Sequence, residues 1–265
     1  MKTSVVACLA ALLVPFFSGR AQIPSPVASI TPIATESAIA SPTPTATGAP
    51  PTVSALASPR PIARKLIYKP PADAGNIPIR VAGGVRGEGG IDAALLTLVP
   101  NHVALTTQAQ PSLFWFQSKP AKAKFELTIV EPMKPTPLLV LTSPDADKPG
   151  IHRIKVSRYK VELEPDVAYE WYVAIIPDPE NRSKDIVAKG GIKRIKPPAE
   201  LAAGIEKADD VERAALYAQG GIWYDTLEAI SNAIEAYPED ASLREKRASL
   251  LKQNGLYQAA ALDKK

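Results

Sequence analysis

Few residues in the chain could do chemistry, and they are scattered. His102 and His152 lie in or beside predicted strands, with no second histidine and no patterned carboxylates close in sequence. A zinc site needs three or four ligands at short, regular spacing, so we expect each histidine to be hydrogen-bonded or solvent-facing. The Gly-x-Ser-x-Gly and His-Glu-x-x-His patterns of serine and zinc hydrolases are absent. We therefore assign no catalytic, cofactor-binding or metal-binding residue and expect no cofactor.

Two acidic loops are the remaining candidates for such a site. One contains Asp145 and Asp147, and the other contains Asp178, Glu180 and Asp185. Carboxylates at one end of a β-sandwich could hold calcium, and a pair across the sandwich could hydrolyse a glycosidic bond. Neither loop has an EF-hand pattern, and Asp is a common turn residue. Turn formation is the preferred interpretation, and calcium binding and a carboxylate-dependent hydrolase remain alternatives.

Composition restricts the partners. The 265-residue chain has 31 Lys and Arg residues and 27 Asp and Glu residues. Without Lys2 and Arg20, which lie in a predicted leader, 29 basic residues face 27 acidic ones, an excess too small to indicate a nucleic acid partner. The one cysteine, Cys8, lies in the same leader, so the mature chain would have no disulfide and no thiol site.

The first 80 residues predict export and a tether. Residues 1–21 start with Lys2, continue through an apolar run and end in small residues, as in a secretory signal peptide. The run is shorter than the roughly 20 residues of a membrane-spanning helix, so we expect no span in the mature chain. Residues 22–80, rich in Pro, Ser, Thr and Ala, predict a disordered tether. The protein would then be periplasmic or displayed on the cell surface.

Residues 81–197 predict a β-sandwich. They open with a Gly-rich stretch, residues 81–90, which matches no phosphate-binding fingerprint and is interpreted as a hinge. Short β-rich runs then alternate with turn residues, and helix-length connections are missing, which favours an antiparallel sandwich of immunoglobulin or fibronectin type. The predicted strands are Leu95–Val99, Val103–Thr107, Leu113–Gln117, Lys124–Glu131, Leu138–Thr142, Ile151–Ser157, Tyr169–Ile176 and Ile186–Ile195.

One stretch of the sequence predicts a turn that leads into a strand of the sandwich. Leu163, Tyr169 and Trp171 share one face, and Pro165-Asp166 interrupts the chain between Leu163 and the strand. A tyrosine corner of a β-sandwich has this arrangement. We interpret these three residues as structural.

Residues 198–265 change to a helical period, rich in Ala, Leu, Glu and Lys. Predicted helices span 208–219, 223–236, 241–252 and 257–263, and Asp209-Asp210 would cap the first. Gly221 and Gly255 are 34 residues apart, in matching contexts. This spacing resembles the tetratricopeptide repeat. Because about three repeats are needed for independent stability, we expect the helices to pack on the sandwich or on a partner.

Several short motifs in a fixed order resemble the bacterial, largely cyanobacterial, family called domain of unknown function 928. They occur between about Val81 and Ile230 and include Gly83 to Gly87, Tyr169 to Tyr172, Gly191 to Arg194 and Gly221 to Asp225. The resemblance implies an exported protein but brings no activity. Family members often have two cysteines at places where this chain has Gly89-Gly90 and Pro177, which implies a disulfide that this chain lacks.

The leading functional hypothesis is a non-catalytic module that binds an envelope or secreted protein. Tyr217, Trp223 and Tyr224 are the predicted protein-binding surface, with core packing as the alternative for Trp223. A second hypothesis is a carbohydrate- or cell-wall-binding sandwich that uses exposed Tyr159 or Tyr172. The hydrolase is the third.

Overall fold

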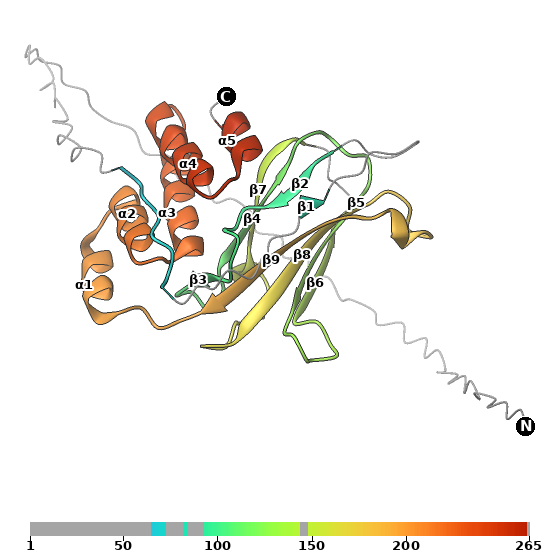
Figure 1. The fold of residues 1–265 in the computed structure, drawn as a ribbon, viewed down its shortest axis with the longest axis horizontal. Coiled ribbons are helices and arrows are strands. Elements are labelled where there is room, and N and C mark those ends of the chain that lie inside the picture. The colour runs from blue at the N-terminus through green and yellow to red at the C-terminus, as the bar shows by residue number, and fades with distance from the viewer. Residues whose placement is uncertain (1–64, 73–81, 84–92, 144–147, 264–265) are drawn as a thin grey trace, which may run out of the picture. The chain divides into compact units, whose positions relative to one another are not determined.

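The computed structural model describes residues 65–72, 82–83, 93–143 and 148–263 (Figure 1). The predicted leader, most of the predicted tether and the hinge after residue 83 lie outside these ranges. So do Asp145 and Asp147, and therefore that acidic loop. The described residues all fall within one unit, residues 57–265.

All eight predicted strands form, with ends within two residues of the predicted ones. The first sheet has the order β3 (Ala104–Thr106), β9 (Ile186–Arg194), β8 (Ala168–Ile176), β5 (Lys124–Val130) and β6 (Leu139–Ser143). The second has the order β1 (Ala82–Gly83), β2 (Leu95–Thr97), β4 (Ser112–Gln117) and β7 (Gly150–Lys155). Short 3-10 helices follow β7 at Val156–Arg158 and precede β9 at Arg182–Lys184.

The prediction of purely antiparallel sheets is wrong at one edge, because β3 pairs in parallel with β9. The antiparallel prediction rested on the short connections between strands that are consecutive in the chain. Strands β4 to β8 lie between β3 and β9 in the chain, so the connection is long enough for parallel pairing, with no α-helix among its described residues. The last bond of this edge runs from the N–H of Ile195 to the oxygen of Thr106 (2.8 Å).

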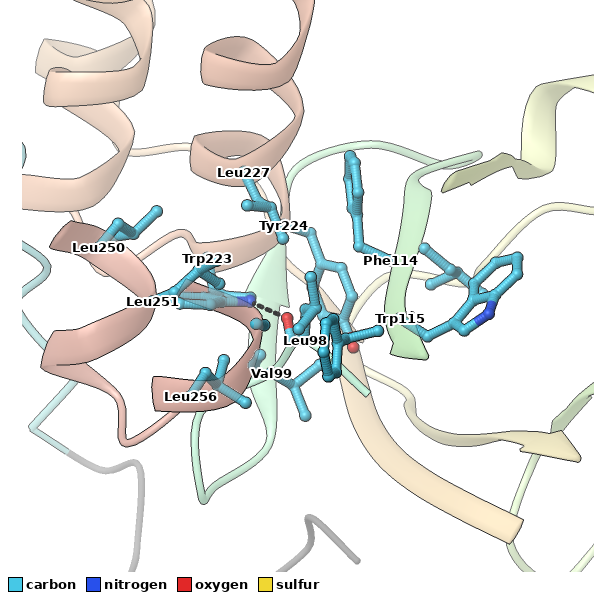
Figure 2. Packing of buried hydrophobic residues seen from close by; sticks show 14 of the residues in the cluster. Leu98, Val99, Phe114, Trp115, Trp223, Tyr224, Leu227, Leu250, Leu251 and Leu256 are labelled. Carbon is cyan, nitrogen blue, oxygen red and sulfur yellow. Dashed lines mark hydrogen bonds between the residues drawn. The ribbon is translucent and has the colours of Figure 1, made fainter. Parts of the chain in front are cut away.

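Strand β4 is buried on both faces because it lies between the other sheet and the helices. Figure 2 shows Phe114 and Trp115 on opposite sides of this strand. The Trp115 ring stacks on Phe125 of β5, with ring centroids 4.7 Å apart, and so joins the two sheets. Phe114 lies on the helical side, 1% exposed. The whole of β4 is consequently apolar or hydrogen-bonded, whereas β5 shows the simple alternation expected of a strand with one buried face.

The three residues of the predicted corner are buried. Leu163, Tyr169 and Trp171 are 1%, 2% and 0% exposed. The Tyr169 hydroxyl accepts a hydrogen bond from the backbone N–H of Glu164 (3.2 Å), which closes the turn before β8. The chain reverses direction at Asp166, which has a positive φ of 64°. Asp adopts this conformation more readily than most residues do.

The four predicted helices form almost as expected, and one more precedes them. They are α2 (Asp210–Gln219), α3 (Trp223–Ala236), α4 (Ala241–Gln253) and α5 (Tyr257–Asp263), and the additional helix is α1 (Ala199–Lys207). The Asp209 side chain caps α2 by accepting from the N–H of Glu212 (2.8 Å), as predicted. Helix α1 has no buried residue, and no helix was predicted before residue 208.

The 34-residue repeat is visible in the turns. Gly221 and Gly255 both have a φ of 72°, a left-handed conformation that glycine adopts without strain. The N–H of Ile222 bonds to the oxygen of Tyr217 in the first turn, and the N–H of Leu256 bonds to the oxygen of Leu251 in the second. The two turns are thus built alike and lie at the same end of their helix pairs. None of the helices in the described ranges is long and apolar enough to cross a membrane.

Replacing Tyr169 with Phe should lower the free energy of unfolding by about 1 kcal/mol, the usual net value of one hydrogen bond. The ring would keep its packing, and only the bond to Glu164 would be lost. Urea denaturation of both proteins measures the difference. The matched control is Tyr172→Phe, whose hydroxyl bonds to the partly exposed Glu170; an equal loss there would contradict the role of the corner.

Candidate functional site

The three residues predicted to form an exposed binding surface are buried. Tyr217, Trp223 and Tyr224 are 7%, 0% and 1% exposed, so the prediction of a surface is wrong for them. Core packing, the alternative considered for Trp223, is what the structure has. The reason is that the sheets cover the apolar face of these helices, so that the face belongs to one common core. The boundary predicted at residue 197 remains a prediction, but the core continues across it.

Tyr224 connects the helices to two neighbouring strands of the first sheet. Its hydroxyl accepts a hydrogen bond from the indole Nε1 of Trp171 in β8 (2.7 Å) and donates one to the oxygen of Gly191 in β9 (3.0 Å). Trp223 beside it donates from Nε1 to the oxygen of Leu98 (2.7 Å), the dashed line of Figure 2. A tyrosine that joins three elements by two buried bonds fixes their distance more tightly than apolar packing does.

Gly190 makes room for this contact. A Cβ at that position would lie 2.8 Å from Nε1 of Trp171, closer than real Cβ atoms approach a nitrogen. The indole therefore lies close to the β9 backbone and reaches Tyr224 only because residue 190 has no side chain.

Asp225 is a buried carboxyl at the same boundary. It is 3% exposed, and both the backbone N–H and the hydroxyl of Thr107 donate to it. Burial raises the pKa of Asp225 to about 6, against the opposing effect of these hydrogen bonds. A raised pKa can mark a catalytic acid, but here the carboxyl is enclosed between α3 and the end of β3.

The polar face of α3 continues this contact along the second sheet. Arg153 of β7 donates to Glu228 (2.6 Å), Asn232 (2.7 Å) and Glu235 (3.0 Å), which lie three to four residues apart on one side of α3. Ser112 of β4 donates to the same Glu228 carboxylate (2.8 Å). These groups satisfy one another, so we interpret them as the attachment of the helices to the sheet.

An extended segment upstream of the first sheet lies against the helices. In Lys65–Ala72, which we call the docked segment, Leu66 and Tyr68 are 3% and 7% exposed, whereas Ile67 between them is 45% exposed. The Tyr68 ring packs edge-on against Trp223, with centroids 5.0 Å apart. Its hydroxyl lies 3.3 Å from both the oxygen of Gly221 and Nε2 of His102.

The helices hold the backbone of the docked segment through its own peptide groups. The Gln253 side chain accepts from the N–H of Tyr68 (3.1 Å) and donates to the oxygen of Leu66 (2.8 Å). The N–H of Lys69 donates to the oxygen of Ala218 (3.0 Å). A Cβ on Gly221 would lie 2.8 Å from the oxygen of Lys69, so this glycine also permits the close approach of the segment.

Both histidines are hydrogen-bonded, in agreement with the preferred interpretation. Nδ1 of His102 lies 2.9 Å from the oxygen of Val103 and donates to it, because a carbonyl can only accept. His152 stacks on Trp115 and bonds through Nε2 to the oxygen of Lys148 (2.9 Å). Among the described residues no group of three or more His, Cys, Asp or Glu side chains could hold a metal ion.

Two carboxylates of the described acidic loop, those of Asp178 and Asp185, are paired with cations. Lys184 lies 3.0 Å from Asp178, and its hydrogen bond lowers the pKa of that carboxyl. Arg182 bonds to Asp185 (2.6 Å). A glycosidase acid needs a raised pKa instead, so this loop resembles a braced turn more than a hydrolytic site.

Tyr159 and Tyr172, the predicted glycan contacts, are both half-buried. The Tyr172 hydroxyl donates to Glu170 (2.6 Å), and Nζ of Lys189 lies 5.6 Å from the centre of its ring. A sugar that stacked on this ring would have to displace the lysine.

One comparison with known proteins identifies the family. The model of the family described as Domain of Unknown Function (DUF928) matches residues 81–263. The chain belongs to the DUF928 family. No curated protein matches it.

The DUF928 match covers both sheets and all five helices, from just before β1 to the end of α5. Gly191 and Tyr224, which belong to two of the motifs that carried the resemblance, are hydrogen-bonded to each other. The docked segment lies upstream of the match. Gly89-Gly90, one site of the implied disulfide, lies outside the described residues, and that implication remains a prediction.

Sequence reasoning missed the docked segment, because the surrounding prolines and lysines favoured a tether. The available signal was the alternation of Leu66 and Tyr68 with polar or exposed neighbours, which is the period of a strand. Nothing in the sequence indicates that a helical end would be its partner.

Replacing Tyr224 with Phe should lower the free energy of unfolding by about 3 kcal/mol, because the buried Trp171 indole N–H would lose its acceptor and the Gly191 oxygen its donor. Urea denaturation measures this. Tyr257→Phe is the matched control, since Tyr257 is 67% exposed and surface changes are usually within about 0.5 kcal/mol. A loss below 1 kcal/mol for Tyr224→Phe would contradict the connecting role.

Asp225 should make stability depend on pH. Because burial raises the pKa of Asp225 to about 6, its stabilising contribution is complete below about pH 4, where the folded and the unfolded chain are both protonated. As the pH rises towards about 6, the unfolded chain loses this proton first, and the free energy of unfolding should fall by up to about 3 kcal/mol.

Asp225→Asn keeps this position uncharged and should remove that fall. Denaturation curves of both proteins between pH 4 and 7 test it. The difference between the two proteins is the measured quantity, since it cancels the titration of other carboxylates. Parallel pH profiles for the two proteins would contradict the assignment.

Proposed function

We propose that this protein is an exported, non-catalytic interaction module that binds another protein in the periplasm or at the cell surface. The docked segment carries the proposal. The end of the helical part already holds an extended peptide, by backbone hydrogen bonds and by two buried side chains. Peptide-recognition surfaces work in this way.

Export and tethering belong to the same proposal. The predicted signal peptide and the Pro-rich residues 22–64 would place the folded part at a distance from the membrane or wall. We also propose an immunoglobulin- or fibronectin-like identity for the paired sheets, supported by the tyrosine corner. A tetratricopeptide-like identity for α2 to α5 is supported by the 34-residue repeat of the turns.

The alternatives have weaker support. Glycan binding at Tyr172 competes with the Lys189 contact, and hydrolysis at the described acidic loop would need a pair of carboxyls that are not held by cations, whereas Asp178 and Asp185 are both held. Both remain testable by a glycan array and by activity assays on the intact protein.

The proposal predicts where a partner binds. Tyr257 is 67% exposed and follows the Gly255 turn, whereas Tyr237 is 55% exposed and lies at the opposite end of α3 and α4. Tyr257→Ser should reduce the recovery of a specific partner at least about fivefold, the effect of a contact worth about 1 kcal/mol. Tyr237→Ser, the matched control, should leave recovery unchanged.

The measurement is quantitative capture from envelope extract with the mature full-length chain as bait. Deleting the helices would be a poor test, since Trp223 and Tyr224 belong to the core. No protein recovered specifically over a bait-free control would sink the proposed function. If a partner is recovered equally with both variants, the proposed function stands, but its binding site does not lie at the end of the helices near the Gly255 turn.

A further inference from the structure

The docked segment crosses two equivalent turns of the helical repeat. Tyr68 and Lys69 contact the Gly221 turn, and Leu66 and Tyr68 contact Gln253, which directly precedes the Gly255 turn. Since the two turns are built alike, they present their backbones side by side at one end of the helices. A segment that spans both is recognised by the repeat as a whole.

The contacts are those of a receptor with an extended ligand. Three of the hydrogen bonds use only the ligand's backbone: two reach the Gln253 side chain and one reaches the oxygen of Ala218. Any extended peptide offers these groups. Selectivity comes from the two inward side chains, Leu66 and Tyr68, while Lys65, Ile67 and Lys69 are exposed and free to vary.

The Tyr68 position is the more selective of the two. Its ring fits between Trp223 and the His102 ring, and its hydroxyl can donate its one proton to either of two acceptors at the inner end, Nε2 of His102 and the oxygen of Gly221. A phenylalanine could fill the space but would leave these buried groups without that partner. The site therefore fits tyrosine best.

We propose that this docking groove, formed by His102, Ala218, Gly221, Trp223 and Gln253, is a receptor for extended peptides of the pattern aliphatic-x-Tyr, and that the chain's own docked segment competes for it with such a peptide of a partner protein. This rests on the proposed function and names its ligand class. It also supplies a regulatory step, because a partner that binds must release the docked segment and with it the N-terminal part of the chain.

Competition within one chain explains how the groove would be kept closed. A ligand joined to its receptor acts at an effective concentration of the order of millimolar, so a free peptide of equal intrinsic affinity would bind the intact chain weakly. Weakening the docked segment alone should unmask the groove. A substitution that weakens the groove itself should abolish the binding of both the docked segment and the free peptide.

The test uses a fluorescently labelled synthetic peptide of residues 62–72 and the mature full-length chain, with binding read by fluorescence anisotropy. Tyr68→Ala in the protein should tighten peptide binding at least tenfold over the unsubstituted chain. Ile67→Ala, which removes an exposed side chain of the same segment, should have no effect. Adding Gln253→Ala to Tyr68→Ala should return binding to the weak level, and a peptide with Ala in place of its tyrosine should not bind.

Folding is checked by circular dichroism, and a second variant covers the case in which Tyr68→Ala does not fold. A protease site is inserted between residues 75 and 76 and is cut after the protein has folded. When the cut protein is diluted, the severed segment should dissociate, and the labelled peptide should take its place. A folded Tyr68→Ala chain that does not bind the peptide overturns the proposal. So does a cut chain that unfolds on dilution, or one that never exchanges its segment.

Two further outcomes separate the hypotheses. If the unsubstituted chain forms a dimer that Tyr68→Ala abolishes, the groove takes the segment of a second copy, and the partner peptide is overturned. If the peptide exchanges but no protein is captured from envelope extract, the groove stands and the proposed function falls. Capture that depends on Tyr257 without peptide exchange overturns only the groove.

Discussion

The hydrogen-bonded hydroxyl of Tyr224 is the contact on which the rest of this structure depends. It lies where β8, β9 and α3 meet, takes the indole proton of Trp171 and gives its own to Gly191. Around it the apolar side chains of both sheets and of the helices form one core. The sheets bury the apolar face of an incomplete repeat, and the repeat covers a face of β4 that would otherwise meet water.

That mutual dependence explains why the helices are stable although so few of them follow the 34-residue period. A helix pair that cannot bury its face alone needs a neighbour, and here Arg153 and Thr107 complete the polar part of the contact while Trp223 and Tyr224 complete the apolar part. Helices α3, α4 and α5 are further joined by Arg247, which pairs with Asp263 and donates to Ser231.

Much of the fold follows from local pattern. The alternation of Phe125, Leu127 and Ile129 sets β5, Asp209 sets the start of α2, and the two glycines in the repeat set its turns. What failed was the assignment of partners. The side chains of Tyr217, Trp223 and Tyr224 lie on an amphipathic face, and the pattern shows that such a face exists but not what covers it. The parallel pairing of β3 with β9 was missed for the same reason, since it joins segments far apart in the chain.

The candidate site was the least predictable part. Leu66 and Tyr68 stand among lysines and prolines, and their burial depends on Gln253 and Gly221, more than 150 residues away. The residues next to Leu66 and Tyr68 in the sequence do not indicate such a distant contact. The family motifs indicated the core, and the groove lies at its margin.

The position of the docked segment also decides how the molecule would carry mechanical load. A force that pulled on the chain ahead of Lys65 would act first on the hydrogen bonds between the docked segment and Gln253 and on the contacts of Tyr68, and only afterwards on the strands. Under such a force the docked segment would detach before the paired sheets separate.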